Sequence, residues 1–140
     1  MIDRRALAAA LLAIAAAAPL AHADEGAHAT RKITSSENYI ATPTLSAAIT
    51  RDYQFAGLLV VDAGFDIPDP QLREYVQKMQ PRITDALRTS LAEYAYSRFH
   101  PGGAPDPDRI ATMLQAAADQ AIGRPGARFL LSNVMVQRGR

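Results

Sequence analysis

Hydrophobic positions in three stretches of the chain follow the patterns of β-strands. Tyr53 to Ile67 holds the continuous apolar run Leu58-Leu59-Val60-Val61, whose length and β-branched residues predict a central strand. Tyr39 to Thr50 alternates more loosely and is interrupted near Pro43, which predicts an edge strand. Ala127 to Gln137 is apolar at nearly every position, as in a strand covered on both faces.

After the central strand the apolar period changes to three or four residues, which predicts a long helix. Asp69 is placed to cap it, and Pro70 suits its first turn, where a missing amide proton costs nothing. Pro81 lies off the apolar face, so we expect one bent helix, running to about Phe99, rather than two. The apolar stripe is Leu72, Val76, Met79, Ile83, Leu87, Leu91 and Tyr94. The opposite face carries Arg73, Lys78, Arg82, Asp85, Arg88 and Glu93, and this mixture of charges predicts a solvated face.

A turn rich in Pro and Gly, residues 100–105, separates this helix from a second one. Asp106-Pro107 repeats the cap-and-proline opening, and Gly123 ends the helix. Its apolar face is Ile110, Met113, Leu114, Ala117, Ala118, Ala121 and Ile122. The resulting order of strand, strand, helix, helix and strand predicts an α+β fold, a small antiparallel or mixed sheet with both helices on one face.

The start of the chain has the features of a cleavable signal peptide. Two arginines precede the apolar run 6–20, and small residues at Ala21 and Ala23 form a cleavage pattern that releases a chain beginning at Asp24. The alanine-rich part, residues 6–18, is shorter than the roughly 17 to 25 apolar residues that span a bilayer. We therefore expect a periplasmic protein that is held in the membrane only if residues 1–23 are retained.

The export route stays open at the level of sequence. Arg4 and Arg5, with Leu7 two positions beyond the pair, resemble a twin-arginine signal, but the general secretory route needs only positive charge and an apolar run. After residues 1–23, the polar stretch 24–38 reads as a flexible lead-in, and residues 39–140 as one α+β domain.

Composition narrows the classes of function. With 15 basic and 14 acidic residues the formal charge is +1, which gives no reason to expect nucleic acid or an anionic membrane surface as a partner. The absence of cysteine excludes thiol catalysis, disulfides and thiolate metal sites.

The acidic residues offer one candidate metal site, which the sequence explains better in other ways. Asp62, Asp66 and Asp69 are spaced by four and three, and three carboxylates can hold Ca²⁺ or Mg²⁺. In a strand, however, Asp62 and Asp66 lie roughly 13 Å apart, and Asp69 is a helix cap. We expect no metal and no cofactor.

Catalytic constellations are equally sparse. His28 falls in the lead-in and His100 in a Pro/Gly turn, so neither is placed as the base of a nucleophile. Asp106 and Asp108 are spaced like an acid-base pair but suit a helix cap and its first turn. The glycine pairs Gly102-Gly103 and Gly123 with Gly126 lack the lysine of a phosphate loop. We expect no catalytic residue and no enzyme activity.

The segments GLLVVDAGFDIPDP, LREYVQKMQPRITDALRTSLAEY, DRIATMLQAAADQAIG and RFLLSNVMVQ, in this order after an apolar start, resemble the periplasmic domain of FliL, the flagellar basal-body-associated protein. The resemblance covers about residues 38–137. Pro81, Arg82, Asp85 and Leu87 match a helix pattern of that family, and Val136-Gln137 matches its closing strand. The chain also resembles short exported proteins that carry a Tat pathway signal.

This resemblance implies a fold similar to the stomatin and prohibitin type, assembly side by side into rings around the flagellar stator, and a role in cell motility. FliL proteins keep a transmembrane helix, whereas the apolar segment here is short and alanine-rich. The implied protein is a non-enzymatic periplasmic one that acts by protein-protein interaction or self-association.

Two functions from different classes therefore remain. The first is assembly, because something must cover the second face of the terminal strand: the first strand, the helices or another copy. The second is a soluble binding module for a small apolar ligand, held between helices and sheet by Leu87, Leu91, Tyr94 and Tyr96.

Overall fold

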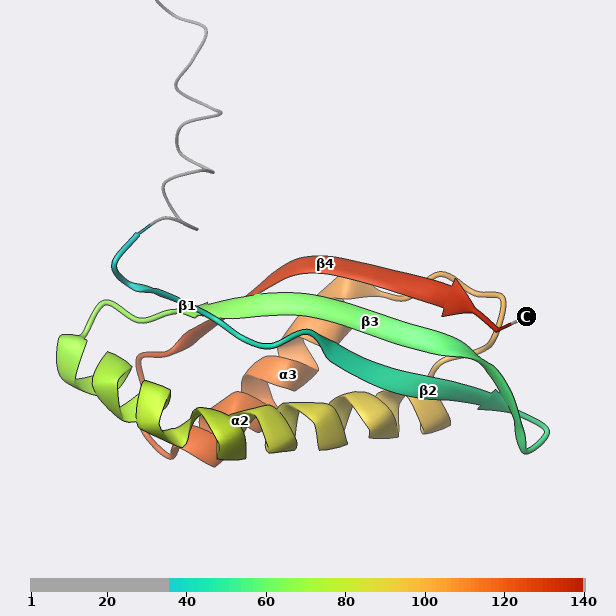
Figure 1. Cartoon of the computed structure of the whole chain (residues 1–140), viewed down its shortest axis with the longest axis horizontal. Helices are drawn as coiled ribbons and strands as arrows, with labels where there is room; N and C mark the ends of the chain where they lie inside the picture. The colour runs from blue at the N-terminus through green and yellow to red at the C-terminus, as the bar shows by residue number, and fades with distance from the viewer. Residues whose placement is uncertain (1–35, 140) are drawn as a thin grey trace, which may run out of the picture.

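A computed structural model describes residues 36–139 of the chain. Four strands and two helices follow one another as three strands, two helices and a final strand, and both helices lie on one face of the sheet (Figure 1). The α+β class predicted from the sequence is confirmed. The expected signal peptide, with Arg4, Arg5, Ala21, Ala23 and Asp24, and most of the lead-in lie outside the described residues.

The sheet is antiparallel and is built around β3 (Gln54–Asp66). β1 (Tyr39–Ala41) and β2 (Leu45–Arg51) pair one after the other with one edge of β3, and β4 (Arg128–Arg138) pairs with the other edge. β3 is therefore the central strand that its continuous apolar run predicts.

The first predicted strand is divided in two where the sequence places a proline. Between β1 and β2 the chain loses its regular pairing at residues 42–44, which include Pro43. Thr42 bridges the gap, because its amide nitrogen and its hydroxyl both donate to the carbonyl of Ala63, at 3.1 and 2.9 Å. These two hydrogen bonds keep the interrupted strand attached to β3. The expected interrupted edge strand is confirmed.

Both helices begin at the cap residues that the sequence predicts, and the second helix ends at Gly123 as expected. The Asp69 carboxylate accepts from the amide of Gln71 at 2.9 Å and opens α2 (Pro70–Ser97), which continues through the exposed Pro81. Asp106 accepts from the amides of Asp108 and Arg109 and opens α3 (Pro107–Ile122). Gly123 ends α3 with φ 69°, a left-handed conformation that glycine adopts without steric cost.

The core lies between the helices and one face of the sheet. The inward residues of β3 and the apolar stripes of both helices form one buried cluster, in which Leu59, Val61, Leu87, Leu91 and Leu114 have no exposed surface. Phe65 and Phe129 meet edge to face across β3 and β4, with ring centroids 5.5 Å apart. Two strands more than 60 residues apart in sequence are thereby joined in one core.

One charged residue of α2 is not on the solvated face where we expected it. Arg73 is half-buried, and its Nη1 donates to the carbonyl of Ile67 at 2.7 Å and to Oδ1 of Asn38 at 3.1 Å. Arg73 therefore joins the start of α2 to the segment before β1. The chain turns back on itself at Pro68, and this leaves the Ile67 carbonyl and the Asn38 amide oxygen within reach of the guanidinium group. The pattern of charges along a helix cannot reveal this contact.

The expectation that β4 is covered on both faces is wrong for the chain as described. Phe129 is buried, but the rest of β4 is half-buried or exposed, and Met135 is 41% exposed. The helices cover the inner face of the sheet, and β1 and β2 take the opposite edge, so neither reaches the outer face of β4. The apolar residues of this strand are left partly in solvent.

Gly64 on β3 makes a close contact that generates a first prediction. A Cβ added there would collide with the ring and hydroxyl of Tyr39, which lies over the glycine on the outer face of the sheet. We expect Gly64→Ala to displace this ring and to lower the free energy of unfolding by about 1 to 3 kcal/mol. Denaturant titration of the wild type and the variant measures the loss.

The same substitution in a Tyr39→Ala background is the control. Without the ring the new methyl group has room, so Gly64→Ala is expected to cost clearly less there. An equal cost in both backgrounds would show that contact with Tyr39 is not the cause.

Candidate interaction surface

Among residues 36–139 no helix covers the outer face of the sheet, which forms a surface of mixed character (Figure 1). One row across the strands is Ser46, Val60 and Met135, and Val60 at its centre is 8% exposed. The next outward residue of β3 towards the turn is Leu58, half-buried beside Gln137. Apolar side chains thus follow the middle of this face towards β4.

Asp62 lies on the same face and is held by two neighbours. Its Oδ1 accepts from the Thr44 hydroxyl at 2.8 Å, and its Oδ2 accepts from the Asn133 amide at 3.4 Å. These contacts tie β3 to both edges of the sheet. Asp62 therefore has an evident structural role.

The three aspartates considered for a metal are engaged separately. Asp62 has its sheet contacts, Asp66 faces Arg128 with 3.6 Å between Oδ2 and Nη2, and Asp69 caps α2. Among residues 36–139 no group of three or more His, Cys, Asp or Glu residues is placed to hold a metal ion.

The residues considered for acid-base chemistry are also dispersed. His100 is exposed beside a turn, where its carbonyl accepts from the amide of Gly103 at 3.0 Å. Asp106 caps α3 and Asp108 lies exposed in its first turn, as expected from their positions. Lys78 lowers the pKa of Glu74 by a hydrogen bond of 2.7 Å and by its charge, in a fully exposed pair one helical turn apart.

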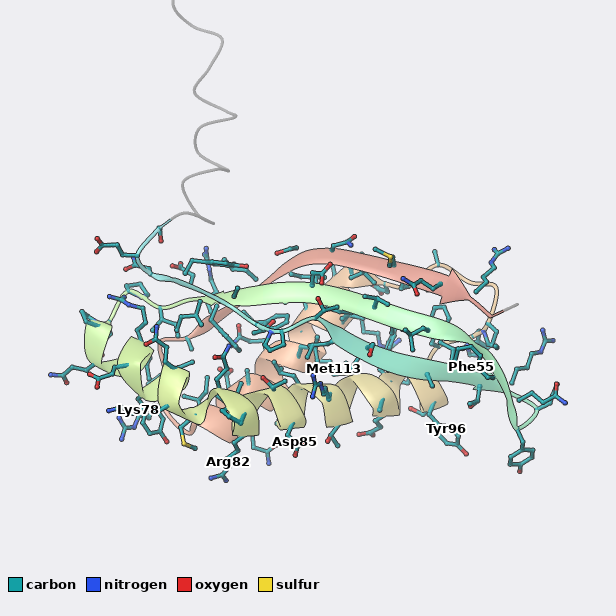
Figure 2. All side chains as sticks on the ribbon, viewed as in Figure 1. Phe55, Lys78, Arg82, Asp85, Tyr96 and Met113 are labelled. Carbon is teal, nitrogen blue, oxygen red and sulfur yellow. The ribbon has the colours of Figure 1, made fainter. Side chains whose placement is uncertain are left out.

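The four residues predicted to line an apolar ligand site are not brought together. Leu87 and Leu91 are fully buried in the core, Tyr94 is 4% exposed, and Tyr96 is 79% exposed. Figure 2 shows Tyr96 near the far end of α2, away from Met113. No single cavity can be lined by side chains placed in this way.

A groove between the two helices is the nearest feature to such a site. One part has a volume of about 500 Å³ and lies between Tyr94 and Met113, and another of about 680 Å³ continues past Asp85 and Arg82. Its walls are largely alanine, serine and charged side chains. A site for an apolar ligand is normally lined by larger apolar groups.

The free edge of β4 is the most distinctive feature of this surface. Within the described chain β4 pairs with β3 alone, so the backbone groups along its other side have no strand beside them. Its apolar residues are half-buried or exposed, namely Leu130, Leu131, Val134, Met135 and Val136. Long apolar edges of this kind pair with further strands unless charge or proline blocks them.

Gln115 on α3 fixes where β4 begins, and nothing in the sequence pattern indicates this role. Its Oε1 accepts from the amide of Phe129 at 2.7 Å, and its Nε2 donates to the carbonyl of Ala127 at 3.0 Å and to Asp119 at 2.8 Å. The glutamine side chain supplies the donor and the acceptor that this strand end requires.

Two further findings concern membrane-spanning segments and similarity to known proteins. Neither helix among residues 36–139 is both long and apolar enough to cross a membrane. No protein-family model matches the chain, and no curated protein matches it in sequence.

The role of Gln115 gives a second prediction. We expect Gln115→Leu to remove the hydrogen bonds that hold the start of β4 and to lower the free energy of unfolding by about 1 to 3 kcal/mol. Amide hydrogen exchange should show the largest loss of protection at Phe129.

Thr112→Leu, an exposed position of α3, is the matched control and should leave exchange at Phe129 unchanged. Protection of Phe129 that survives Gln115→Leu would mean that the strand end is held by the β3 ladder alone.

Proposed function

We propose that this chain is a non-enzymatic exported protein that works by protein-protein assembly, as FliL domains do, and that the free edge of β4 is where it assembles. The observation that carries the proposal is this edge: β4 is an eleven-residue strand with apolar side chains, and within the described chain only its β3 side is paired with another strand. FliL is the family whose sequence pattern the chain resembles.

A second copy is a suitable occupant of the edge. An added strand would satisfy the unpaired backbone groups of β4 and bring apolar side chains against Met135 and Val136. Two copies related by a two-fold axis present the same edge to each other, so a single chain supplies both halves of the contact. Apolar burial of this kind is the usual driving force of association.

Among residues 36–139 the candidate catalytic and metal-binding residues lie apart from one another. His100 is the single histidine of the described chain, and it lies exposed next to a turn. The aspartates among the candidates have structural partners or cap helices. The surface presents apolar side chains and unpaired backbone groups along β4, and such groups mediate protein-protein assembly.

The third prediction tests the edge directly. We expect the wild-type protein to form a concentration-dependent oligomer and Met135→Lys to weaken it by about tenfold or more, because a lysine on an edge strand disfavours pairing. Size-exclusion chromatography with light scattering over a dilution series measures the dissociation constant.

Ser46→Lys is the matched control. Ser46 is exposed in the same row and on the same face as Met135, but on the opposite edge strand. It should leave the oligomer unchanged. A wild-type protein that stays monomeric at every concentration, or an equal effect of both lysines, would contradict assembly through β4.

The fourth prediction concerns export. We expect the mature protein to begin at Asp24, or at Thr30 if the second small-residue pattern at Ala27 and Ala29 is used, and to occur in the soluble periplasmic fraction. Mass spectrometry of the protein from fractionated cells determines its first residue.

Retention of residues 1–23 in the membrane fraction would contradict cleavage and would favour an anchored, stator-associated protein. Replacement of Arg4 and Arg5 by lysine separates the two export routes, because the twin-arginine route depends on the arginine pair and the general secretory route on positive charge alone.

A further inference from the structure

Three elements finish at the same end of the molecule, and an arginine is the last residue or the C-cap of each. β2, α2 and β4 run to this end (Figure 1). Arg51 is the last residue of β2, Arg138 is the last residue of β4, and Arg98 caps the C-terminus of α2. All three side chains are exposed. The fold therefore brings three arginines from segments that are far apart in sequence to one end, with Asp52 beside Arg51 and with Glu93 and Asp108 lining one groove with Arg98.

Exposed aromatic residues collect at the same end. Tyr53 is fully exposed in the turn between β2 and β3, Phe55 follows it with 61% exposure, and Tyr96 in the last turn of α2 is 79% exposed. Figure 2 shows Phe55 and Tyr96 towards this end of the molecule. Of the large hydrophobic residues exposed among residues 36–139, Met135 is the one that lies elsewhere, on the outer face of the sheet.

The turn that carries Tyr53 is strained. Asp52 and Tyr53 have φ values of 50° and 63°, the left-handed conformation that a two-residue hairpin of this type requires. Glycine or asparagine adopts it readily, whereas a bulky side chain does so at a cost. Because the Tyr53 ring is entirely in solvent, it contributes no packing energy that would offset this cost. A strained and unsupported aromatic residue points to a role outside the chain.

The surface at this end of the molecule is concave. A concavity of about 380 Å³ lies between the ends of β2 and β4 and the turn after α2, with Arg51 and Arg138 on its rim and Phe99 in its wall. The acidic group of the hairpin, Asp52, is 3.9 Å from Arg51, and both side chains are largely exposed. Solvent weakens such a pair, so both arginines stay available to an anion.

We propose that this end, formed by Arg51, Tyr53, Phe55, Tyr96, Arg98 and Arg138, binds the surface of an anionic lipid bilayer. Tyrosine and phenylalanine rings partition into the headgroup region, where an apolar ring and a polar tip are both accommodated. Arginine donates two hydrogen bonds at once to a phosphate group and is attracted by the negative surface. The protruding hairpin presents both kinds of group together.

Charge and shape favour a bilayer over a protein partner. The aromatic residues stand on separate projecting elements, a hairpin tip and a helix end, and do not form one packed patch like the core of a protein interface. The formal charge of the whole chain is only +1, so the attraction is local to this end. Of the six residues Arg138 alone belongs to β4, whose free edge runs along the side of the sheet, so assembly there leaves the hairpin tip and the end of α2 accessible.

The experiment is sedimentation with lipid vesicles, using the protein from Asp24 to Arg140, which retains every described residue. We expect it to bind vesicles of phosphatidylglycerol and phosphatidylcholine in equal parts, to bind pure phosphatidylcholine far more weakly, and to be released by salt. Tyr53→Gly with Phe55→Ser, and separately Arg51→Gln with Arg138→Gln, should each weaken binding by about tenfold.

The variants separate loss of contact from loss of fold. Tyr53→Gly relieves the strained turn, so thermal unfolding of the aromatic variant should show a stable protein. Arg82→Gln with Arg88→Gln, both exposed on α2 and remote from the edge of β4, is the matched control and should bind as the wild type does.

Absence of binding to the anionic vesicles, or an equal loss in the control, would overturn the proposal. The proposal does not depend on assembly through β4. If Met135→Lys abolishes the oligomer while the monomer still binds vesicles, the bilayer contact stands by itself, and if vesicle binding fails in an intact oligomer, assembly stands without it.

Discussion

The antiparallel pairing of β3 with β4 is the interaction on which the rest of the structure depends. It joins the centre of the chain to its end, and it places Phe65 against Phe129 and Val61 beside Val134 above the helices. Both helices lie in the intervening chain, so the pairing closes the layer that they cover. This contact joins segments that are far apart in sequence. The sheet is therefore complete only after β4 has paired with β3.

The same pairing creates the features from which function is proposed. The pairing of β4 with β3 completes the core. Within the part of the chain that the structure describes, it leaves the other side of β4 without a paired strand and the outer face of the sheet without a helix. It also brings the end of β4 beside the β2–β3 hairpin, where Gly139 donates to the carbonyl of Ala56 at 2.9 Å. One long-range contact thus produces the open edge and places Arg138 beside the start of β3.

Local signals were strong enough to predict most elements of the fold. Asp69 and Asp106 act as caps because a carboxylate satisfies free amides wherever a helix begins, and Pro43 interrupts an edge because it lacks a donor. The candidate surface was less predictable. An apolar run such as that of β4 is compatible with burial on both faces, and nothing local reveals that one face stays open.

The sequence by itself determined the elements, their caps and the apolar stripes, since these depend on neighbours within a few residues. Tertiary structure alone decided that Arg73 is half-buried against Asn38, that Tyr96 is exposed while Tyr94 is buried, and that Arg51, Arg98 and Arg138 share one end. Net charge and periodicity average over position along the chain, whereas a surface depends on which distant segments the fold places side by side.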